Sequence, residues 1–515
     1  MIVHKPSGKL ILNLREPGRV TTVIPTSSAM QFKGENLVVV PHREDEVRVL
    51  RNLGFDPPSP ITTYYDWPGQ FEPYAHQRST AEFLTLNPWA FCLNGMGSGK
   101  TMSVLWAFDY LRGRGLARKM LVVAPLSTLT RTWADEAFTH FPEMRVNVLY
   151  GAMERRLKLL ALDADVYVIN HDAIKSKEML AALAARRDID IVVIDEVAAF
   201  RTAGTARFKS AKKLVKDRTY VWGLTGTPTP NGPTDAWAQC QLITPHTVPA
   251  YFGAFRDRVM KQVSTFKWVP RDDALTAVRD AMQPAIRFSR QDCIDLPPTT
   301  YQTRTAPLTP EQKAAFDSMV KAFKAEYAGG QVLAVNEAVK LGKLVQICCG
   351  VAYSTDGGEV ELPCQPRIDL VREIIEEAEA KVIVFVPYTG ALRRLAAELA
   401  KEFTVEMIYG AVSKTERDRI FADFQKRTNP RVLVADARTM SHGLNLTAAN
   451  TIVWFGPTTS NDTYGQANER IPRPGQKLDT NIIHIESSPI EAKMYDRLRK
   501  KSSLQGTLLE MLKGA

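Results

Sequence analysis

A glycine-spaced turn followed by Lys-Thr has the clearest chemical meaning in this sequence. Apolar residues lead into Gly97-Ser98-Gly99-Lys100-Thr101, and a segment with helical apolar spacing follows. A strand that ends in glycines and reopens as a helix exposes backbone N–H groups at the positive end of a helix, where phosphates bind. In such a loop Lys100 reaches the β- and γ-phosphates of a nucleotide, and the Thr101 hydroxyl suits Mg²⁺. A glycine-rich turn without a ligand is the alternative for this stretch alone.

Gln77 and the pair Asp195-Glu196 extend this nucleotide chemistry. A glutamine side chain has both a donor and an acceptor, so Gln77 could read the N6/N7 edge of adenine. Asp195 follows an apolar run, and a carboxylate at the carboxyl end of a buried strand can hold Mg²⁺ through water. Glu196 can then polarise the attacking water. Strand ends also carry acids without a catalytic role, but a pair that follows a phosphate loop favours the catalytic interpretation.

Two stretches at later strand ends and helix starts could respond to the nucleotide. Residues 225–228, Thr-Gly-Thr-Pro, place short hydroxyls where a sensor could link the nucleotide state to a second surface. Arg470 and Arg473 lie three residues apart at a helical start without obvious acidic partners, so both could point at a triphosphate. Surface salt bridging explains the two arginines equally well from this stretch alone.

Short, fully apolar runs separated by helical patterns predict the scaffold that positions these residues. Such runs indicate strands of a parallel sheet covered on both faces. The runs of the first half of the chain are residues 120–124, 166–169, 191–194 and 221–224. Those of the second half are residues 381–386, 406–409, 431–435, 451–455 and 481–485. The second half has no phosphate loop of its own. The predicted fold class is α/β with two parallel sheets.

The same patterns divide the chain into five segments. Residues 1–68 alternate short β-like runs with Pro, Gly and Ser turns, and a helix is expected at 43–53. The stretch 246–365 carries long amphipathic helices and is too irregular for another sheet. We expect a small α+β accessory domain (1–68), a first lobe (69–245), a helical insertion or linker (246–365), a second lobe (366–490) and a C-terminal helix (491–515).

Composition bounds the class of protein. The 515 residues are 45% hydrophobic and 24% charged, as in ordinary soluble globular proteins. A net charge of +10 weakly favours a polyanionic partner. The six cysteines form no CxxC pair, so neither a zinc cage nor a disulfide framework is indicated. No apolar run approaches the ~20 residues that span a bilayer, and the N-terminus lacks a signal-peptide core, so a cytoplasmic location without membrane contact is expected.

Taken together, motifs over residues 70–512 resemble the superfamily 2 helicase-like motors, specifically the Swi/Snf-type branch that pumps double-stranded DNA. The resemblance rests on ordered blocks. Beyond the phosphate loop and Asp195-Glu196 box, they are residues 122–129 with Trp133 (similar to motif Ia), 223–232 (motif III), 344–349 (the helix before the second lobe), 442–449 (motif V) and 466–476 (motif VI).

The resemblance implies two RecA-like lobes with ATP and Mg²⁺ in the cleft between them. Gln77 would read adenine, and the loop residues Gly97, Ser98, Gly99, Lys100 and Thr101 would bind phosphate and metal. Asp195 would hold the metal and Glu196 the hydrolytic water, with Arg470 and Arg473 as arginine fingers. The residues implied to touch the DNA backbone, without reading sequence, are Ser127, Thr128, Asn170, Thr439 and Asn445.

Two positions depart from the family pattern. Asn94 stands at the start of the phosphate loop. The strict phosphate-loop pattern has glycine at this position, and members of the resembled family usually have an acid there. Ala198 ends the Asp195-Glu196-Val197-Ala198 box, where the family commonly has His or another polar residue that couples hydrolysis to the other motifs. The route of that coupling is therefore open.

The leading hypothesis is an ATP-driven double-stranded DNA translocase that migrates branches, regresses forks or anneals strands in replication, recombination or repair. Compact size resembles phage or bacterial relatives, which would act in the host cytoplasm, and residues 1–68 could bind forks or junctions. The alternatives are a strand-separating DNA or RNA helicase, a motor that strips proteins from DNA, and a non-hydrolysing DNA-binding scaffold. The intact Lys100, Asp195, Glu196, Arg470 and Arg473 argue against the scaffold.

Overall fold

The structure, a computed structural model, describes residues 1–95, 97–264, 267–289, 297–328, 334–353, 358–440, 446–473 and 475–500. The chain divides between residues 293 and 294 into two compact units, called unit 1 and unit 2 here. Among the described residues, no helix is long and apolar enough to cross a membrane.

Unit 1 is built on a seven-stranded sheet in which all neighbouring strands are parallel. The strand order is β13-β5-β10-β9-β6-β8-β7. The strands are β5 (Trp89–Cys92), β6 (Lys119–Ala124), β7 (Val146–Val148), β8 (Val166–Asn170), β9 (Ile189–Asp195), β10 (Tyr220–Leu224) and β13 (Ala285–Ile286). The four runs predicted for the first half of the chain correspond to β6, β8, β9 and β10.

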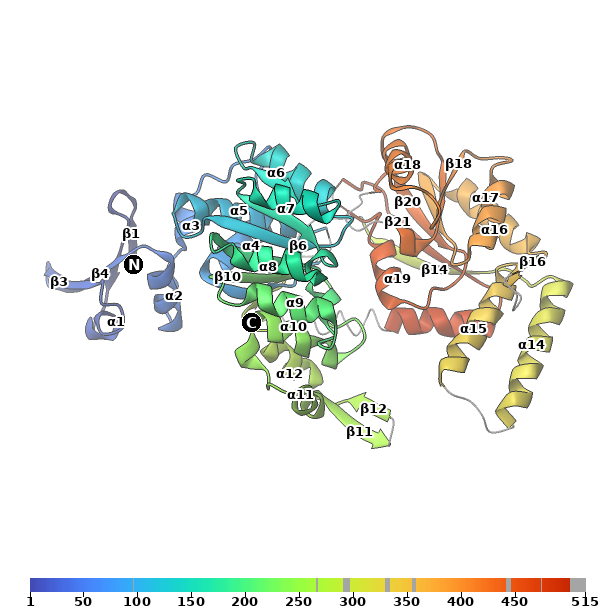
Figure 1. The fold of residues 1–515 in the computed structure, drawn as a ribbon, viewed down its shortest axis with the longest axis horizontal. Helices are drawn as coiled ribbons and strands as arrows, with labels where there is room; N and C mark the ends of the chain where they lie inside the picture. Colours follow the sequence, from blue (N-terminus) through green and yellow to red (C-terminus); the bar gives the residue numbers. More distant parts are fainter. Residues whose placement is uncertain are drawn as a thin grey trace. The chain divides into compact units, whose positions relative to one another are not determined.

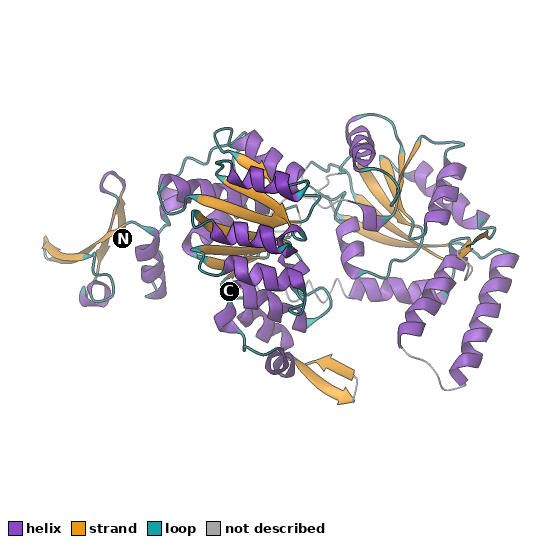
Figure 2. Cartoon of the chain, viewed as in Figure 1, coloured by secondary structure: helices purple, strands orange, loops and turns teal. Residues whose placement is uncertain are grey.

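Helices cover both faces of this sheet, as Figures 1 and 2 show. They include α4 (Ala75–Leu86), α5 (Lys100–Gly113), α6 (Asp135–His140), α7 (Met153–Ala161), α8 (Lys177–Ala185), α9 (Ala206–Val215) and α10 (Ala236–Ile243). Side chains alternate along each strand, so Leu121 and Val192 belong to one hydrophobic cluster while Val122 and Val193 belong to the other. Burial on both faces explains why these strands read as continuous apolar runs.

The first residues of unit 1 form a small antiparallel sheet of order β1-β2-β4-β3. Its elements are β1 (Ile2–His4), β2 (Lys9–Asn13), α1 (Gly18–Thr21), β3 (Ser28–Phe32), β4 (Glu35–Pro41) and α2 (Glu44–Asn52), with α3 (Pro60–Tyr64) following. Leu10 and Val38 pack with Val47 and Leu50 of α2 in a separate core. Arg51 pairs with Glu82 of α4 at 2.6 Å, which ties this sheet to the larger one. The predicted α+β fold of this N-terminal region is therefore confirmed.

The stretch after β10, expected as a helical insertion or linker, contains strands as well as helices. Between α11 (Phe252–Val259) and α12 (Ala274–Ala281), strands β11 (Met260–Ser264) and β12 (Lys267–Pro270) pair as an antiparallel hairpin. β13 then joins the sheet of unit 1, and β14 (Thr299–Thr305) joins that of unit 2. β13 has only two residues and the side chains of β14 are mostly exposed, so neither gives an apolar periodicity.

Unit 2 contains a six-stranded parallel sheet of order β14-β21-β20-β17-β19-β18. The remaining strands are β17 (Lys381–Phe385), β18 (Val405–Ile408), β19 (Val432–Ala435), β20 (Ala449–Trp454) and β21 (Thr480–Glu486), which match the predicted runs within two residues. The fold class, α/β with two parallel sheets, is therefore confirmed.

Helices surround the sheet of unit 2 as well. They are α14 (Pro310–Ala328), α15 (Ala334–Cys348), α16 (Gln365–Glu377), α17 (Thr389–Leu399), α18 (Lys414–Lys426) and α19 (Asn461–Asn468), and a small hairpin joins β15 (Val351–Tyr353) to β16 (Glu359–Glu361). A last helix runs through residues 489–500, and the rest of the expected C-terminal helix lies outside the described residues. It is anchored by a fully buried ion pair, in which Arg367 of α16 meets Glu491 at 2.8 Å.

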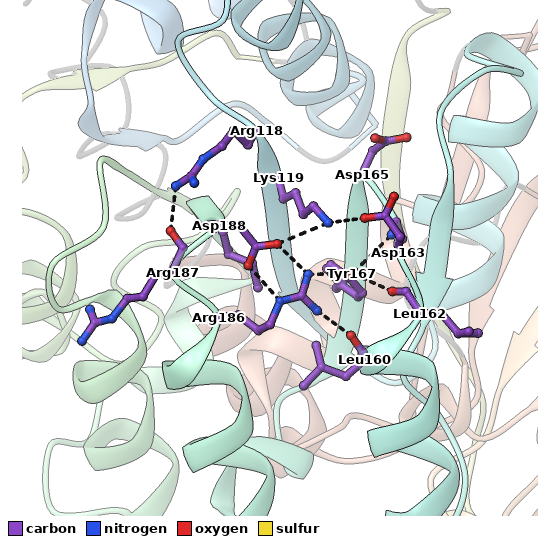
Figure 3. A network of polar contacts seen from close by, with 12 residues as sticks. Arg118, Lys119, Leu160, Leu162, Asp163, Asp165, Tyr167, Arg186, Arg187 and Asp188 are labelled. Carbon is purple, nitrogen blue, oxygen red and sulfur yellow. Dashed lines mark hydrogen bonds and ion pairs between the residues drawn. The ribbon is translucent and has the colours of Figure 1, made fainter.

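Figure 3 shows a polar network of unit 1 that includes Lys119, Tyr167 and Asp188. Lys119 begins β6 and Asp188 immediately precedes β9, so the network lies at the edge of the sheet opposite the phosphate loop, which follows β5. Arg186 donates to Asp188 at 2.7 Å and to the Tyr167 hydroxyl at 2.9 Å. Lys119 pairs with Asp188 at 3.2 Å and also with Asp163. The Arg186 hydrogen bonds, with those of Lys119, hold the pKa of Asp188 well below its usual range. The network joins β6, β8 and the start of β9 at the edge that carries no candidate chemistry.

Replacing Asp188 by Asn should destabilise unit 1 in a pH-dependent way. Because the folded pKa is depressed, the stabilising contribution is present above the unfolded carboxyl pKa of about 3.9 and is lost as the pH falls through the lower folded value. We expect Asp188→Asn to lower the free energy of unfolding by about 1 kcal/mol at neutral pH, since the side chain is 32% exposed, and by less at about pH 3. Denaturant unfolding at both pH values measures this. The control Asp257→Asn, at a 58% exposed carboxylate, should change little; an equal loss in both variants would contradict the network's role.

Candidate active site

The carboxyl ends of the strands of unit 1 bring most of the candidate residues to one edge of the sheet. The phosphate loop follows β5, Thr225 follows β10, and Asp195 ends β9. Ser127 follows β6 and Asn170 ends β8, next along the sheet. Because all these strands are parallel, the predicted nucleotide residues lie on one side of β9 and the predicted DNA residues on the other. Asp195 stands at the boundary between the two groups.

The phosphate loop has the backbone that its glycines predict. Gly97 and Gly99 have φ angles of 77° and 74°, a left-handed region that glycine enters without steric cost. Gly99 is the N-cap of α5, so the helix opens directly from the loop. The Lys100 ammonium donates to the carbonyls of Asn94 (2.9 Å) and Gly95 (3.1 Å). A phosphate entering the loop would therefore meet a lysine already held across it.

The first turn of α4 packs against this loop. A Cβ atom on Gly99 would lie 2.1 Å from Nε2 of Gln77, so the glutamine side chain occupies the space that glycine leaves. Gln77 is 4% exposed, and its Oε1 accepts a hydrogen bond from the Tyr74 N–H at 3.0 Å. His76, whose pKa burial lowers, bonds through Nε2 to the Ser98 carbonyl at 2.9 Å. Gln77 thus lies beside the loop, while its reading of adenine stays a prediction.

Asn94 is explained by its contacts. Its Nδ2 donates to the Thr80 hydroxyl at 2.8 Å, and its Oδ1 accepts from the Phe288 N–H at 2.9 Å. The Thr80 hydroxyl donates its own hydrogen bond to the His76 carbonyl at 2.7 Å. The buried position therefore needs a side chain that donates and accepts at once, which an amide does and an ionised acid does not.

The two acids at the end of β9 have different partners. The Trp133 indole N–H donates to Oδ2 of Asp195 at 3.0 Å. Burial raises the pKa of the Asp195 carboxyl, and the Trp133 hydrogen bond and the Lys100 charge oppose that rise. Glu196 has φ 53° and ψ 54°, a strained conformation for a non-glycine residue that costs on the order of 1–3 kcal/mol. Its Oε1 accepts from the Thr225 hydroxyl at 2.9 Å.

The Thr225 contact bears on the open question raised by Ala198. Ala198 is buried in a short helical turn after the acids, and its methyl group can carry no polar coupling. The Glu196 carboxylate itself reaches Thr225, whose Oγ1 also accepts from the Thr227 N–H at 3.1 Å. The acid is thus joined directly to the strand end predicted as a sensor.

The residues present fit a metal that is shared with a nucleotide. Among the described residues, no group of three or more His, Cys, Asp or Glu side chains could hold an ion by itself. Mg²⁺ is commonly bound by one or two protein oxygens together with phosphates and water. Asp195 and the partly exposed Thr101 match that pattern.

The predicted DNA residues are only partly available at the surface. Ser127 and Asn170 are half-buried. Thr128 is 4% exposed and its hydroxyl donates to the Pro125 carbonyl at 3.0 Å. In unit 2 the Thr439 hydroxyl donates to the Asp436 carbonyl at 2.8 Å. Asn445 lies outside the described residues, as do residues 442–444 of the motif V stretch.

Arg470 and Arg473 follow α19 in unit 2, and both are buried, at 3% and 9% exposure. Arg473 donates through Nε to the Glu469 carbonyl at 2.9 Å. Burial and the charge of Arg473 lower the pKa of Arg470 to about 9, which still leaves it charged at neutral pH. Both guanidinium groups are therefore buried inside unit 2 and not exposed on its surface.

Sequence reasoning missed the side chains that hold the acids and the loop. Trp133 was noticed only as part of a motif, and His76, Thr80 and His171 were not singled out. His171 bonds through Nε2 to the Asp195 carbonyl at 2.8 Å. Trp133 and Asp195 are 62 residues apart, so no local spacing could have revealed their contact.

Comparison with known families gives two matches. Residues 92–349 match the SNF2-related domain, and residues 366–475 match the helicase conserved C-terminal domain.

Individual relatives have low sequence identity to this chain but align with most of its length. Protein p41 of Acyrthosiphon pisum secondary endosymbiont phage 1 is 26% identical over 451 residues, 83% of this chain and 95% of that protein. YwqA of Bacillus subtilis (strain 168), described as an ATP-dependent helicase/translocase, is 25% identical over 453 residues, 83% of this chain and 47% of that protein. Among solved structures, the Sulfolobus solfataricus SWI2/SNF2 ATPase core in complex with dsDNA aligns with a TM-score of 0.42 and 23% identity, covering 87% of this chain and 94% of that one.

Thr225→Val should slow nucleotide hydrolysis without weakening nucleotide binding. The change keeps a similar shape and removes the hydroxyl that donates to Glu196. A hydrogen bond to a charged group contributes about 1.5–3 kcal/mol, so the rate of ATP hydrolysis should fall about 10- to 100-fold. Steady-state hydrolysis and equilibrium binding of a non-hydrolysable ATP analogue measure the two effects. Thr225→Ser keeps the hydroxyl and should keep the rate; a Thr225→Val protein with the original rate would show that this contact does not position Glu196.

Proposed function

Because the chain belongs to the SNF2-related ATPases, we propose that it is an ATP-driven motor that moves along double-stranded DNA and remodels branched DNA. Membership confirms the identification, made from the motifs, of a superfamily 2 ATPase of the Swi/Snf type with two RecA-like lobes. It also confirms that the chain is an ATP hydrolase. The DNA substrate, the metal and the individual residue roles are parts of the proposal.

The observation that carries the proposal is the row of side chains along the carboxyl edge of the sheet in unit 1. A phosphate loop, a sensor threonine, two acids and two polar strand ends follow adjacent parallel strands in that order. Ligands of open parallel sheets bind outside the carboxyl ends of the strands. This edge can therefore serve a nucleotide at one end and a second ligand at the other.

The nucleotide half of the edge supplies the binding groups. Backbone N–H groups of Gly97, Ser98 and Gly99 bind phosphate oxygens, and Lys100 turns from the loop carbonyls to the phosphates. Thr101 and Asp195 would hold Mg²⁺, which neutralises charge on the phosphates when bound. Gln77 would read adenine from its position against the loop.

Glu196 is the group that would orient the hydrolytic water. Thr225 donates to one carboxylate oxygen of Glu196 at 2.9 Å, which helps to fix the orientation of the carboxylate. Its strained backbone supports a functional role, since such conformations cluster at active sites. Arg470 and Arg473 of unit 2 would add positive charge to the transferring phosphate as arginine fingers.

The DNA half of the edge is proposed to track the sugar-phosphate backbone. Ser127, Thr128 and Asn170 in unit 1, with Thr439 and Asn445 in unit 2, would make these contacts. Hydroxyl, amide and backbone N–H groups bind phosphates without reading sequence, so little sequence specificity follows. The net charge of +10 and the helicase/translocase description of the Bacillus relative support a polyanionic track.

The branched-DNA role rests on the small antiparallel sheet at the start of the chain. Its edge strand β3 is exposed along its whole length, and an ion pair between α2 and α4 joins this region to the rest of unit 1. We propose that it binds forks or junctions ahead of the motor, in replication, recombination or repair. A strand-separating helicase and a protein-stripping motor use the same ATP site and are separated from this role by their DNA substrates.

ATP hydrolysis should be stimulated by DNA in the order branched, then plain duplex, then single strand. Measuring it with four-way junctions, forks, duplex and single strands at one fixed salt concentration tests this, because phosphate contacts weaken steeply with salt. Lys100→Ala should abolish hydrolysis. Lys158→Ala, at a 75% exposed lysine of the same unit, should retain it.

The DNA substrates that stimulate hydrolysis distinguish the proposed function from its alternatives. Stimulation by no DNA would overturn the motor proposal. Displacement of a strand from a tailed duplex without a branch would favour the strand-separating helicase. Equal stimulation by plain and branched duplex would leave the translocase and remove the branched-DNA role.

A further inference from the structure

We propose that Trp133 is a positioning residue that couples the DNA side of unit 1 to the carboxylate of Asp195. The inference rests on the function proposed above, in which Asp195 holds the metal and Ser127 and Thr128 touch DNA. It answers the question left by Ala198, namely which side chain connects hydrolysis to the DNA-contacting segments.

The contact itself is well defined. The Trp133 indole Nε1 donates to Oδ2 of Asp195 at 3.0 Å. Trp133 is 1% exposed and packs in the same hydrophobic cluster as Leu129 and Val193. One carboxylate oxygen is thus engaged by a ring that the core holds in place, and the carboxylate plane is fixed. In this proposal, the metal or its water is bound by the other oxygen, Oδ1.

The turn that carries Trp133 begins at the predicted DNA contact. Residues Leu129–Ala134 form a π-helical turn, a rare conformation that is frequent at functional sites. The N–H groups of Thr132 and Trp133 both donate to the Thr128 carbonyl, at 3.1 and 3.2 Å. A displacement of Thr128 by a DNA backbone would therefore be transmitted directly to Trp133.

A second contact reaches Asp195 from the same side. His171 follows Asn170 at the end of β8, and its Nε2–H donates to the Asp195 carbonyl at 2.8 Å. Its ring meets Phe200 edge-on at 5.0 Å. Both segments proposed to touch DNA in unit 1 thus hydrogen-bond to Asp195, one to its carboxylate and one to its backbone. Trp133 is the one that reaches the metal-binding group itself.

The test measures how DNA changes the binding of nucleotide, without hydrolysis. A non-hydrolysable ATP analogue with Mg²⁺ is titrated into the full-length protein with and without duplex DNA, and the ratio of the two dissociation constants is the coupling. Allosteric coupling is typically about 5- to 150-fold, and we expect the original protein to fall in that range. Trp133→Phe keeps a buried ring and removes the donor. It should reduce the coupling to about twofold or less, while DNA affinity without nucleotide stays unchanged.

The control is a second buried indole in the same unit. Trp106 is fully buried, and its Nε1 donates to the Pro68 carbonyl at 2.7 Å, away from the acids. Trp106→Phe loses an equivalent hydrogen bond and should keep the full coupling. Trp133→Met is a second donor-free replacement, since methionine fills irregular space in cores. It should reproduce Trp133→Phe if the lost N–H is the cause.

Each outcome decides between the two proposals. Full coupling in a folded Trp133→Phe or Trp133→Met protein would overturn the role of Trp133 and leave the proposed function standing. Loss of DNA affinity in Trp133→Phe without nucleotide would make Trp133 part of the DNA site and would also overturn it. If the original protein shows no DNA effect on nucleotide binding or hydrolysis, the proposed function fails and this inference fails with it.

Discussion

The charge of the Asp195 carboxylate is the constraint on which the site of unit 1 depends. Asp195 ends a strand buried on both faces, and burial raises the pKa of its carboxyl group. The indole N–H of Trp133 and the positive charge of Lys100 oppose this rise and favour the ionised carboxylate, which the proposed metal-binding role requires. The same contacts fix its orientation. Glu196, next in the chain, is held in a strained conformation and tied by Thr225 to the neighbouring strand.

Parallel topology places the two acids between the proposed nucleotide side and the proposed DNA side of the sheet. β9 lies between β10 on one side and β6 on the other, so of the two acids at its end Glu196 meets Thr225 after β10 and Asp195 meets Trp133 from the segment after β6. Unit 2 uses the same architecture for different chemistry. It has no phosphate loop in its sequence, and buries two arginines after α19 instead. Arg470 and Arg473 are the proposed source of positive charge for the transferring phosphate.

The sequence predicted what local patterns encode. Runs such as 120–124 and 381–386 became strands β6 and β17 within a residue, because burial on both faces leaves an uninterrupted apolar run. Gly97 and Gly99, followed by Lys100, predicted a phosphate loop, because the left-handed backbone that such a loop needs is one that few residues other than glycine adopt. The strands β11 and β13 were missed, since one is mostly exposed and the other is two residues long. The partners of Asn94 and Asp195 were also missed, because tertiary packing alone brings Thr80, Phe288 and Trp133 to them.

The central proposal is that ATP bound by unit 1 is hydrolysed only with charge supplied by unit 2. Single-turnover hydrolysis of ATP by Arg470→Ala, with saturating duplex DNA, tests it most directly when binding of a non-hydrolysable analogue is measured alongside. Arginine fingers contribute about 10³–10⁵ in rate, so the account predicts a loss of that order with analogue affinity nearly unchanged. Arg470→Lys, which keeps the charge and loses the planar fork, should recover part of the rate. Hydrolysis by Arg470→Ala at the original rate would contradict the account.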